Sequence, residues 1–178
     1  ILPPSIAPIQ VVIMPILKKS EDSSQLLAYC DELKVALNNG GVRNRLDKRD
    51  EPSIGRRFNE WEVKGVPVRF EVGSKELADA TVTIVRRDTG EKQTVTRKDV
   101  LVMTEKLLKD IQTQLFTKAK THLDANTHDV SDFAQFEEIM RTTRGFIRAF
   151  WCEEVSCEAA IKEKTKATTR CLPLEEEA

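Results

Sequence analysis

The segment that decides the fold is RRFNEWEVKGVPVRFEVG, residues 56–73. Around its first half, three apolar residues have the i, i+4, i+7 spacing of a stripe along one side of a helix: Ile54, Phe58 and Trp61. Gly65 ends this predicted helix. In the strand that follows, one face is apolar and the other holds Pro67, Arg69 and Glu71. The segment therefore predicts a helix and a strand that meet at a corner carrying charges of both signs.

The residues on either side of this segment continue the alternation of helices and strands. Strands are predicted at residues 9–16, 42–46, 66–72, 81–86 and 92–97, and helices at 20–37, 53–64, 74–78 and 99–120, the first of them capped by Ser20. An Asp and a Gly within residues 87–91 predict a hairpin between the last two strands. Such a pattern gives an α/β fold, with a mixed sheet of about five strands flanked by helices, so residues 1–120 are expected to form one domain.

The remainder of the chain is predicted to form a second, small α+β domain. The polar residues 121–132 are expected to be a linker, and residues 133–178 to be the domain itself, incomplete at its C-terminal end. Its predicted elements are a helix at 133–141, a strand at 145–151, a helix at 158–164 and a strand at 168–172.

The composition is typical of a soluble globular protein, because 40% of the 178 residues are hydrophobic and 32% are charged. No apolar run approaches the roughly 20 residues that span a bilayer, so no membrane partner is expected. The first 17 residues are apolar, but four prolines interrupt them and no basic segment precedes them, unlike a signal peptide. Because the chain also begins without Met, we expect a fragment of a longer, cytoplasmic protein.

The formal net charge is −1, but the charges are unevenly distributed. Seven Lys or Arg residues fall between Arg43 and Lys64, whereas residues 175–177 are all Glu. A local basic surface can attract an anionic partner even when the whole protein is nearly neutral. An ordinary solvated surface of mixed charge is the alternative.

The residue types that perform catalysis form no recognisable motif. His122 and His128 are the two histidines, both in or beside the predicted linker, and no Gly-rich phosphate loop follows a strand. No Ser–His–Asp or Cys–His arrangement is apparent. Most carboxylates lie on predicted solvent-exposed faces. We therefore predict no catalytic residue in this chain.

Four cysteines are present, and two of them have the spacing of metal ligands. Cys152 and Cys157 could supply two thiolates to Zn²⁺, and Cys171 a third, but a structural zinc site needs four ligands. The alternative is a pair of reduced cysteines in a small core. Cys30 lies among leucines in a helical pattern and is expected in the core.

Glu62, Arg69 and Lys75 have the side chains that a guanine-binding site requires. Guanine presents O6 and N7 to Arg or Lys, and its N1–H and N2–H₂ groups to a carboxylate. These residues fall at the end of a predicted helix, on the polar face of a strand and just past that strand, so they could converge at one edge of the sheet. Trp61, at the centre of the helical stripe, is more often a core residue than a platform for stacking bases.

Several runs of the sequence resemble the C-terminal part of prolyl-tRNA synthetases of the archaeal and eukaryotic type. The opening run PIQVVIMPI resembles the first strand of the anticodon-binding domain of class II synthetases. More specific are GRRFNEWEVKGVPVRFEVG, RRDTGEK and WCEEVSCEAAIKEKTKATTRCLP. The resemblance covers essentially the whole chain. It implies the class II anticodon-binding fold, followed by a truncated zinc-binding-like domain.

This resemblance implies a function in charging tRNA. The whole enzyme uses ATP, with Mg²⁺, to activate proline and transfers it to tRNA(Pro), but the motifs for that chemistry are not in this chain. The anticodon-binding domain recognises the two guanines shared by proline anticodons. The family's motif falls on Glu62, Lys64, Arg69, Lys75 and Arg57. Arg57 stands where the family has lysine, a change that would preserve a phosphate contact.

The resemblance also implies metal ligands and partners. Zinc-binding members use a Cys-x4-Cys pair, matched by Cys152 and Cys157, and a second pair that this chain lacks, so no cofactor is expected here. Cys171 matches a run outside the ligand set. The implied partner is tRNA(Pro), not DNA, and the whole enzyme is implied to be a homodimer. The alternatives are a non-catalytic synthetase-like module for protein interaction or dimerisation, and a fragment of a sister class II enzyme.

Overall fold

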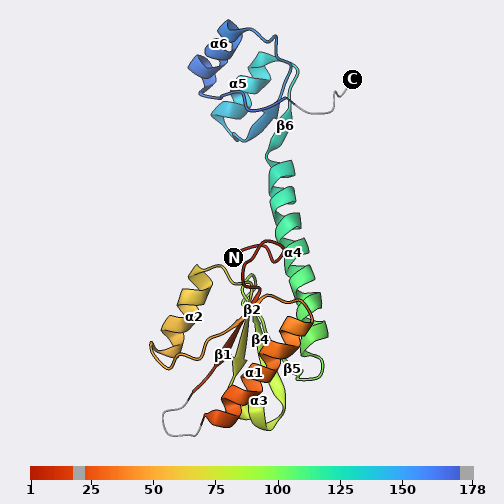
Figure 1. Ribbon diagram of the computed structural model, residues 1–178. Helices are drawn as coiled ribbons and strands as arrows, with labels where there is room; N and C mark the ends of the chain where they lie inside the picture. The colour runs from red at the N-terminus through yellow and green to blue at the C-terminus, as the bar shows by residue number, and fades with distance from the viewer. Residues whose placement is uncertain (18–22, 173–178) are drawn as a thin grey trace. The chain divides into compact units, whose positions relative to one another are not determined.

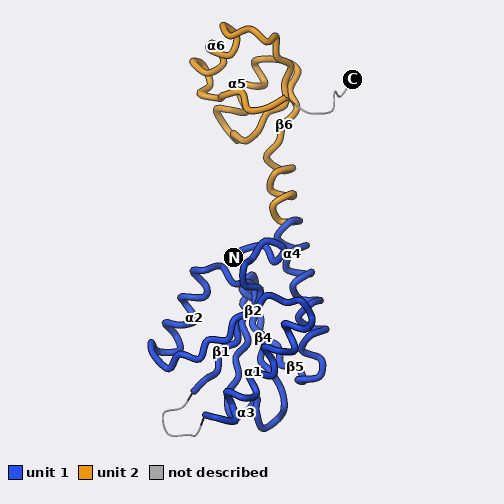
Figure 2. The backbone as a smooth tube through the Cα atoms, viewed as in Figure 1, with its two compact units in different colours: residues 1–117 blue, residues 118–178 orange. Residues whose placement is uncertain are grey.

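The structure, a computed structural model, describes residues 1–17 and 23–172. The predicted helix cap at Ser20 and the acidic residues 175–177 lie outside the described residues. The chain divides into two compact units, residues 1–117 (unit 1) and residues 118–178 (unit 2), coloured separately in Figure 2. None of the described helices is long and apolar enough to cross a membrane.

Unit 1 is built on a five-stranded sheet with the strand order β2-β1-β3-β4-β5 (Figure 1). β1 pairs in parallel with β2 and β3, whereas β3, β4 and β5 are antiparallel neighbours. The strands are β1 (Val11–Pro15), β2 (Asn44–Leu46), β3 (Val68–Val72), β4 (Thr81–Arg86) and β5 (Lys92–Thr96). The helices are α1 (Ser24–Asn39), α2 (Ile54–Val63), α3 (Ser74–Ala78) and α4 (Val100–Ala125), the last of which continues into unit 2. The predicted α/β fold with a mixed five-stranded sheet is confirmed.

One face of the sheet carries the main hydrophobic core, which α1 and α4 cover. Side chains alternate between the two faces of a strand, so Val68 and Phe70 of β3 point into this core and are fully buried. The helices contribute apolar residues at helical spacing: Leu26, Cys30, Leu33 and Leu37 from α1, and Leu107, Leu108 and Ile111 from α4. Cys30 is therefore a core residue, as predicted, and burial raises the pKa of its thiol to about 12.

The opposite face of the sheet carries a smaller core under α2, which lies apart from α1 and α4 in Figure 1. Among the described residues, the buried members of this cluster are Val12, Met14, Trp61 and Val66. None of them comes from β4 or β5. Beyond α2, this face therefore carries mainly polar side chains at positions that pair across the strands: Arg69 and Glu71 in β3, Thr81 and Thr83 in β4, and Lys92, Thr94 and Thr96 in β5.

Unit 2 pairs two short parallel strands, β6 (Thr127–Asp129) and β7 (Phe146–Arg148). Its helices α5 (Phe133–Arg141) and α6 (Val155–Thr165) contact each other. Among the described residues of this unit, Val130 is the one buried hydrophobic residue. Large apolar side chains are exposed instead, including Phe146, Phe150 and Val155.

Two predictions for this part of the chain are wrong. Residues 121–132 are not a linker, because they contain the end of α4 and the strand β6. The run TKAKTHLDA at the end of α4 contains good helix formers although it has no buried face, and its polarity alone suggested a linker. Residues 168–172 form no strand. The partner of β7 is β6, and β7 is shorter than the predicted strand 145–151.

Gly65 provides a direct test of the corner between α2 and β3. Its φ of +78° is costly for other residues, and an added Cβ would lie 2.8 Å from Leu2 Cγ. We expect Gly65→Ala to lower the free energy of unfolding by about 1–2 kcal/mol or more, because the left-handed backbone and the contact with Leu2 both oppose it. Urea unfolding followed by circular dichroism measures the change.

Gly55, within α2, is the matched control. A Cβ added there meets nothing within 4 Å, and the backbone is helical. Gly55→Ala should therefore stabilise the protein by up to roughly 0.5–1 kcal/mol. Equal effects of the two substitutions would show that the corner does not depend on the conformation of Gly65.

Candidate nucleic-acid interface

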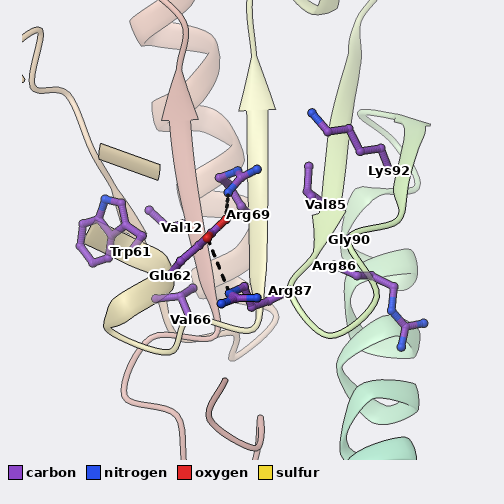
Figure 3. A pocket seen from close by; sticks show the side chains of 10 residues that line it. All are labelled: Val12, Trp61, Glu62, Val66, Arg69, Val85, Arg86, Arg87, Gly90 and Lys92. Carbon is purple, nitrogen blue, oxygen red and sulfur yellow. Dashed lines mark hydrogen bonds and ion pairs between the residues drawn. The ribbon is translucent and has the colours of Figure 1, made fainter. Parts of the chain in front are cut away.

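A pocket of about 150 Å³ lies on the polar face of the sheet, between the end of α2 and the β4–β5 hairpin (Figure 3). Apolar side chains line part of it: Val12, Val66 and Val85, together with the ring of Trp61. Five charged residues line the rest: Glu62, Arg69, Arg86, Arg87 and Lys92. They come from α2, β3 and the hairpin, three elements that are separate in the sequence.

A chain of ion pairs crosses this pocket. Arg69 donates from Nη1 to Glu62 Oε1 at 3.0 Å, and from Nε and Nη2 to Glu71 Oε1 at 3.1 and 2.9 Å. Its guanidinium also lies 4.0 Å from the centroid of the Phe58 ring. Lys92 Nζ donates to the other oxygen of Glu71 at 2.8 Å, and Arg87 Nε lies 4.0 Å from Glu62 Oε2. Figure 3 shows Glu62 between the two arginines.

Exposure divides these groups into a supporting layer and an accessible one. The side chains of Arg69 and Glu71 are only 15% and 10% exposed. Those of Glu62, Arg87 and Lys92 are 38%, 42% and 56% exposed. The carboxylate acceptor Glu62 and the cationic donors Arg87 and Lys92 are therefore accessible to solvent. The pair formed by Arg69 and Glu71 lies largely buried beneath them. This is an arrangement that can match both the donors and the acceptors on the edge of a base.

Arg86 lines the same pocket but has a structural role. It donates from Nε and Nη2 to the two carboxylate oxygens of Asp88 at 3.0 and 2.7 Å, and from Nη2 to Gln114 of α4 at 3.2 Å. The Asp88 hydrogen bonds raise the pKa of Arg86, which keeps its charge. These contacts tie the hairpin that carries Arg87 and Lys92 to the helix on the other face.

The structure brings Glu62 and Arg69 together, as the sequence predicts. Lys64 lies just after α2, with its side chain exposed and Nζ 4.2 Å from the centroid of the Trp61 ring. Trp61 itself is only 8% exposed, and its indole N–H donates to Asp47 Oδ2 at 2.7 Å. The prediction that Trp61 is a core residue rather than a stacking platform is confirmed.

Lys75 is not brought to this pocket. It is an exposed residue of α3, just past the C-terminal end of β3, whereas Arg69 lies near the start of that strand. From Arg69 to Val72 the strand alone advances about 10 Å. The expected convergence of Lys75 with Glu62 and Arg69 is therefore corrected, because the length of β3 separates them.

Arg57 is not available for the phosphate contact that the sequence suggested. The residue is 2% exposed, and its Nη2 donates to the backbone carbonyl of Asp47 at 2.8 Å. Its Nε lies 3.4 Å from the carboxylate of the same residue. The family's motif pointed to Arg57, but the sequence could not show that the loop after β2 covers this side chain.

Asp47, in the loop after β2, accepts hydrogen bonds from three side chains around it: Arg49, Arg57 and Trp61. Its carboxylate receives Trp61 Nε1, Arg57 Nε, and both the backbone N–H and the guanidinium of Arg49, and the residue is 4% exposed. Burial by itself would raise the pKa of Asp47. Hydrogen bonds from Arg49 and Trp61, with the charge of Arg57, outweigh burial and hold that pKa well below its usual range.

Sequence reasoning missed three residues of this site: Asp47, Arg87 and Lys92. The pairing register of the hairpin could have located Lys92, because Arg69 lies opposite Val85 and Val85 lies opposite Lys92. Side chains that face each other across strands share a face. The sequence carries no comparable signal for Asp47.

The cysteine pair of unit 2 does not make a complete metal site. The Cys152 and Cys157 side chains form a hydrogen bond, which raises the pKa of the Cys157 thiol. Cys171 is exposed. Among the described residues, no group of three or more His, Cys, Asp or Glu side chains could hold a metal ion. Two thiols do not fit a structural zinc site, which needs four ligands.

Comparison with known proteins identifies the class to which this fold and site belong. A family model described as an anticodon binding domain matches residues 10–107. The chain belongs to the anticodon-binding domain family. A second model, described as the C-terminal part of prolyl-tRNA synthetase, matches residues 133–178.

The relatives are proline--tRNA ligases. The chain is 42% identical over 176 residues to the one from Natranaerobius thermophilus, a match covering 99% of this chain and 36% of that protein. It is also 42% identical over 179 residues to the one from Chloroflexus aurantiacus, covering 99% and 37%. A crystal structure of prolyl-tRNA synthetase from Cryptosporidium parvum, complexed with L-proline and AMP, matches with a TM-score of 0.87 and 34% identity, covering 99% of this chain and 38% of that one. The chain thus spans little more than a third of their length.

The depressed pKa of Asp47 predicts an acid-sensitive contribution to stability. A folded-state pKa below the unfolded value of about 3.9 means that ionised Asp47 stabilises the fold above that pH, and that this contribution is lost as the pH falls further. Asp47→Asn lacks it. The difference in unfolding free energy between wild type and Asp47→Asn should be largest near neutral pH and shrink on acidification.

Urea unfolding from neutral pH down to about pH 2 measures this difference. Asp31→Asn is the control, because Asp31 forms an exposed pair with Lys48. Its effect should be small across the same range. A difference for Asp47→Asn that stays constant or grows as the pH falls would contradict the assigned role.

Proposed function

We propose that this chain binds tRNA through the anticodon, as the anticodon-recognition part of a proline--tRNA ligase. The observation that carries the proposal is the pocket itself. In a member of the anticodon-binding domain family, an accessible carboxylate, Glu62, lies beside the accessible cations Arg87 and Lys92 on the open face of the sheet. A site that bound only phosphate would have little use for a carboxylate at its centre.

Glu62 is the proposed acceptor for guanine. A carboxylate can accept from N1–H and N2–H₂ at once, which adenine and the pyrimidines cannot match in the same geometry. Arg69 holds one oxygen of Glu62 in place and leaves lone pairs on both oxygens for the base. Arg87, whose contact with Glu62 is the longer one, is free to turn toward a guanine O6 or a phosphate.

In this proposal, the remaining cationic side chains contact mainly the phosphates of the RNA backbone. Lys92 extends from β5 and lines the pocket. Lys64 follows the last residue of α2, with its ammonium group over the Trp61 ring. Lys75, at the far end of β3, is assigned a phosphate or a neighbouring base. Arg57 has no direct role, because its guanidinium is buried against Asp47.

The activity of the whole enzyme is part of the same proposal. The relatives are proline--tRNA ligases, and the resemblance supports a cytoplasmic, homodimeric enzyme in which another part of the protein activates proline with ATP. Within this division, the chain supplies specificity for tRNA(Pro) and no chemistry.

Replacing Glu62 tests base recognition. Against an anticodon stem-loop with the two guanines of proline anticodons, Glu62→Gln should weaken binding by about 1–3 kcal/mol, or roughly ten- to hundredfold in Kd. The amide keeps the shape but offers one acceptor where two are needed. Against the same RNA with inosine in place of guanine, which lacks the N2 amino group, the loss should be much smaller.

Fluorescence anisotropy at fixed salt measures both affinities. Glu105→Gln is the control, because Glu105 is an exposed residue of α4 outside the pocket. An equal loss for both RNAs would leave Glu62 without a role in recognising guanine. Wild-type protein that fails to bind either RNA would favour a module for protein interaction.

Replacing Arg87 tests whether its side chain neutralises a phosphate of the RNA. If it contacts a phosphate, Arg87→Gln should weaken binding to the guanine and inosine RNAs equally, and lower the slope of log K against log salt by about one. Arg45→Gln, an exposed arginine of β2, is the matched control and should leave the slope unchanged. An unchanged slope for Arg87→Gln would mean that this side chain does not neutralise a phosphate.

A further inference from the structure

Asp47 lies at the junction between the sheet and α2. Its backbone N–H donates to the carbonyl of Ile13 in β1 at 3.0 Å, so the residue is fixed to a central strand. Its side chain faces α2 and is almost completely buried. The position of Asp47 is therefore set by the sheet, and its carboxylate acts on the helix.

Three links join Asp47 to one side of α2. Arg57 donates to the backbone carbonyl of Asp47 at 2.8 Å, and Trp61 donates to the carboxylate at 2.7 Å. Arg49 completes the third link, because it donates to both oxygens of Asp47 and to Glu60 Oε2 at 3.0 Å. The helix residues involved are 57, 60 and 61, which share one face at the i, i+3, i+4 spacing.

The hydrogen bonds of Asp47 add to a small apolar core in fixing the position of α2. The core under α2 has four buried apolar residues among the described part of the chain, and partly buried neighbours surround them. Apolar contacts resist separation but are not directional. Directional hydrogen bonds to a buried carboxylate are what can fix the rotation of a short helix about its own axis.

The rotation of α2 matters for Glu62, the next residue after Trp61. Glu62 must present its carboxylate between Arg69 and Arg87, which belong to β3 and to the hairpin. Lys64 also depends on this placement, since its ammonium group lies over the Trp61 ring. A small rotation of α2 would move Glu62 away from partners that are held by the sheet.

We propose that Asp47 is a positioning residue for anticodon recognition: it holds α2 in the rotation at which Glu62 can recognise guanine, without touching the RNA itself. This inference rests on the proposed function of the pocket. It assigns to the loop after β2 a part in specificity that is separate from its part in stability.

Asp47→Asn tests this, using the full 178-residue chain. The readout is the ratio of the affinities for the guanine and inosine stem-loops, because a loss of folded protein lowers both affinities equally and leaves their ratio unchanged. We expect the ratio to fall by about tenfold, since displacing a recognition group by about an ångström costs that much or more. Leu33→Ala, which destabilises the core on the opposite face of the sheet, should leave the ratio at its wild-type value.

Trp61→Phe is the second variant, in case Asp47→Asn does not fold. It keeps an aromatic ring in the core, removes the N–H that Asp47 accepts, and also shortens the side chain by one ring. It should lower the ratio in the same direction by a smaller factor. If either folded variant keeps the wild-type ratio, Asp47 does not position Glu62. If the wild-type protein shows no preference for guanine, the proposed function of the pocket fails first and this inference fails with it.

Discussion

The alternation of side chains along β3 is the constraint on which the rest of unit 1 depends. Val68, Phe70 and Val72 enter the main core under α1 and α4, so Arg69 and Glu71 must point to the other face. Burial of the apolar set fixes the register, because a shift by one residue would place both charges in the core. The same register puts these charges opposite the hairpin residues of β4 and β5.

The charged side chains on that face of the sheet form ion pairs with one another in the absence of a ligand. Glu71 is nearly buried, which is costly for an unpaired carboxylate, but Arg69 and Lys92 each donate to a different one of its oxygens. Arg69 is held further by Glu62 and by the Phe58 ring. Side chains that already have fixed partners lose less conformational freedom on binding, which is the property that the proposed recognition of guanine requires.

The two units use their apolar residues differently. Unit 1 places most of its large aliphatic side chains in two cores, one on each face of the sheet. Unit 2 leaves Phe146, Phe150 and Val155 exposed, and buries Val130 alone among its described hydrophobic residues. Its small size explains part of this, because surface outweighs volume in short chains. The pocket proposed to bind RNA lies in unit 1, where residues of α2 and of the sheet line it.

The sequence by itself determined the local features: helical and strand periods, the hairpin at 87–91, the helix end at Gly65, and the core role of Trp61. Residue type and position pointed to Glu62 and Arg69, and the resemblance to a known family gave the same two residues. These signals are short in range, since each depends on spacing along a few residues. Even so, the same spacing missed the strand β6, because polar composition alone does not exclude a helix end or a short strand.

Only the tertiary structure decided which charged residues share a site. It buried Arg57 against Asp47, separated Lys75 from Arg69 by the length of β3, and brought Lys92 to Glu71 from 21 positions away. The physical reason is that pairing register and loop packing are set by contacts between distant segments. A helical wheel or a strand pattern records which side of an element a residue occupies, but not what covers that side.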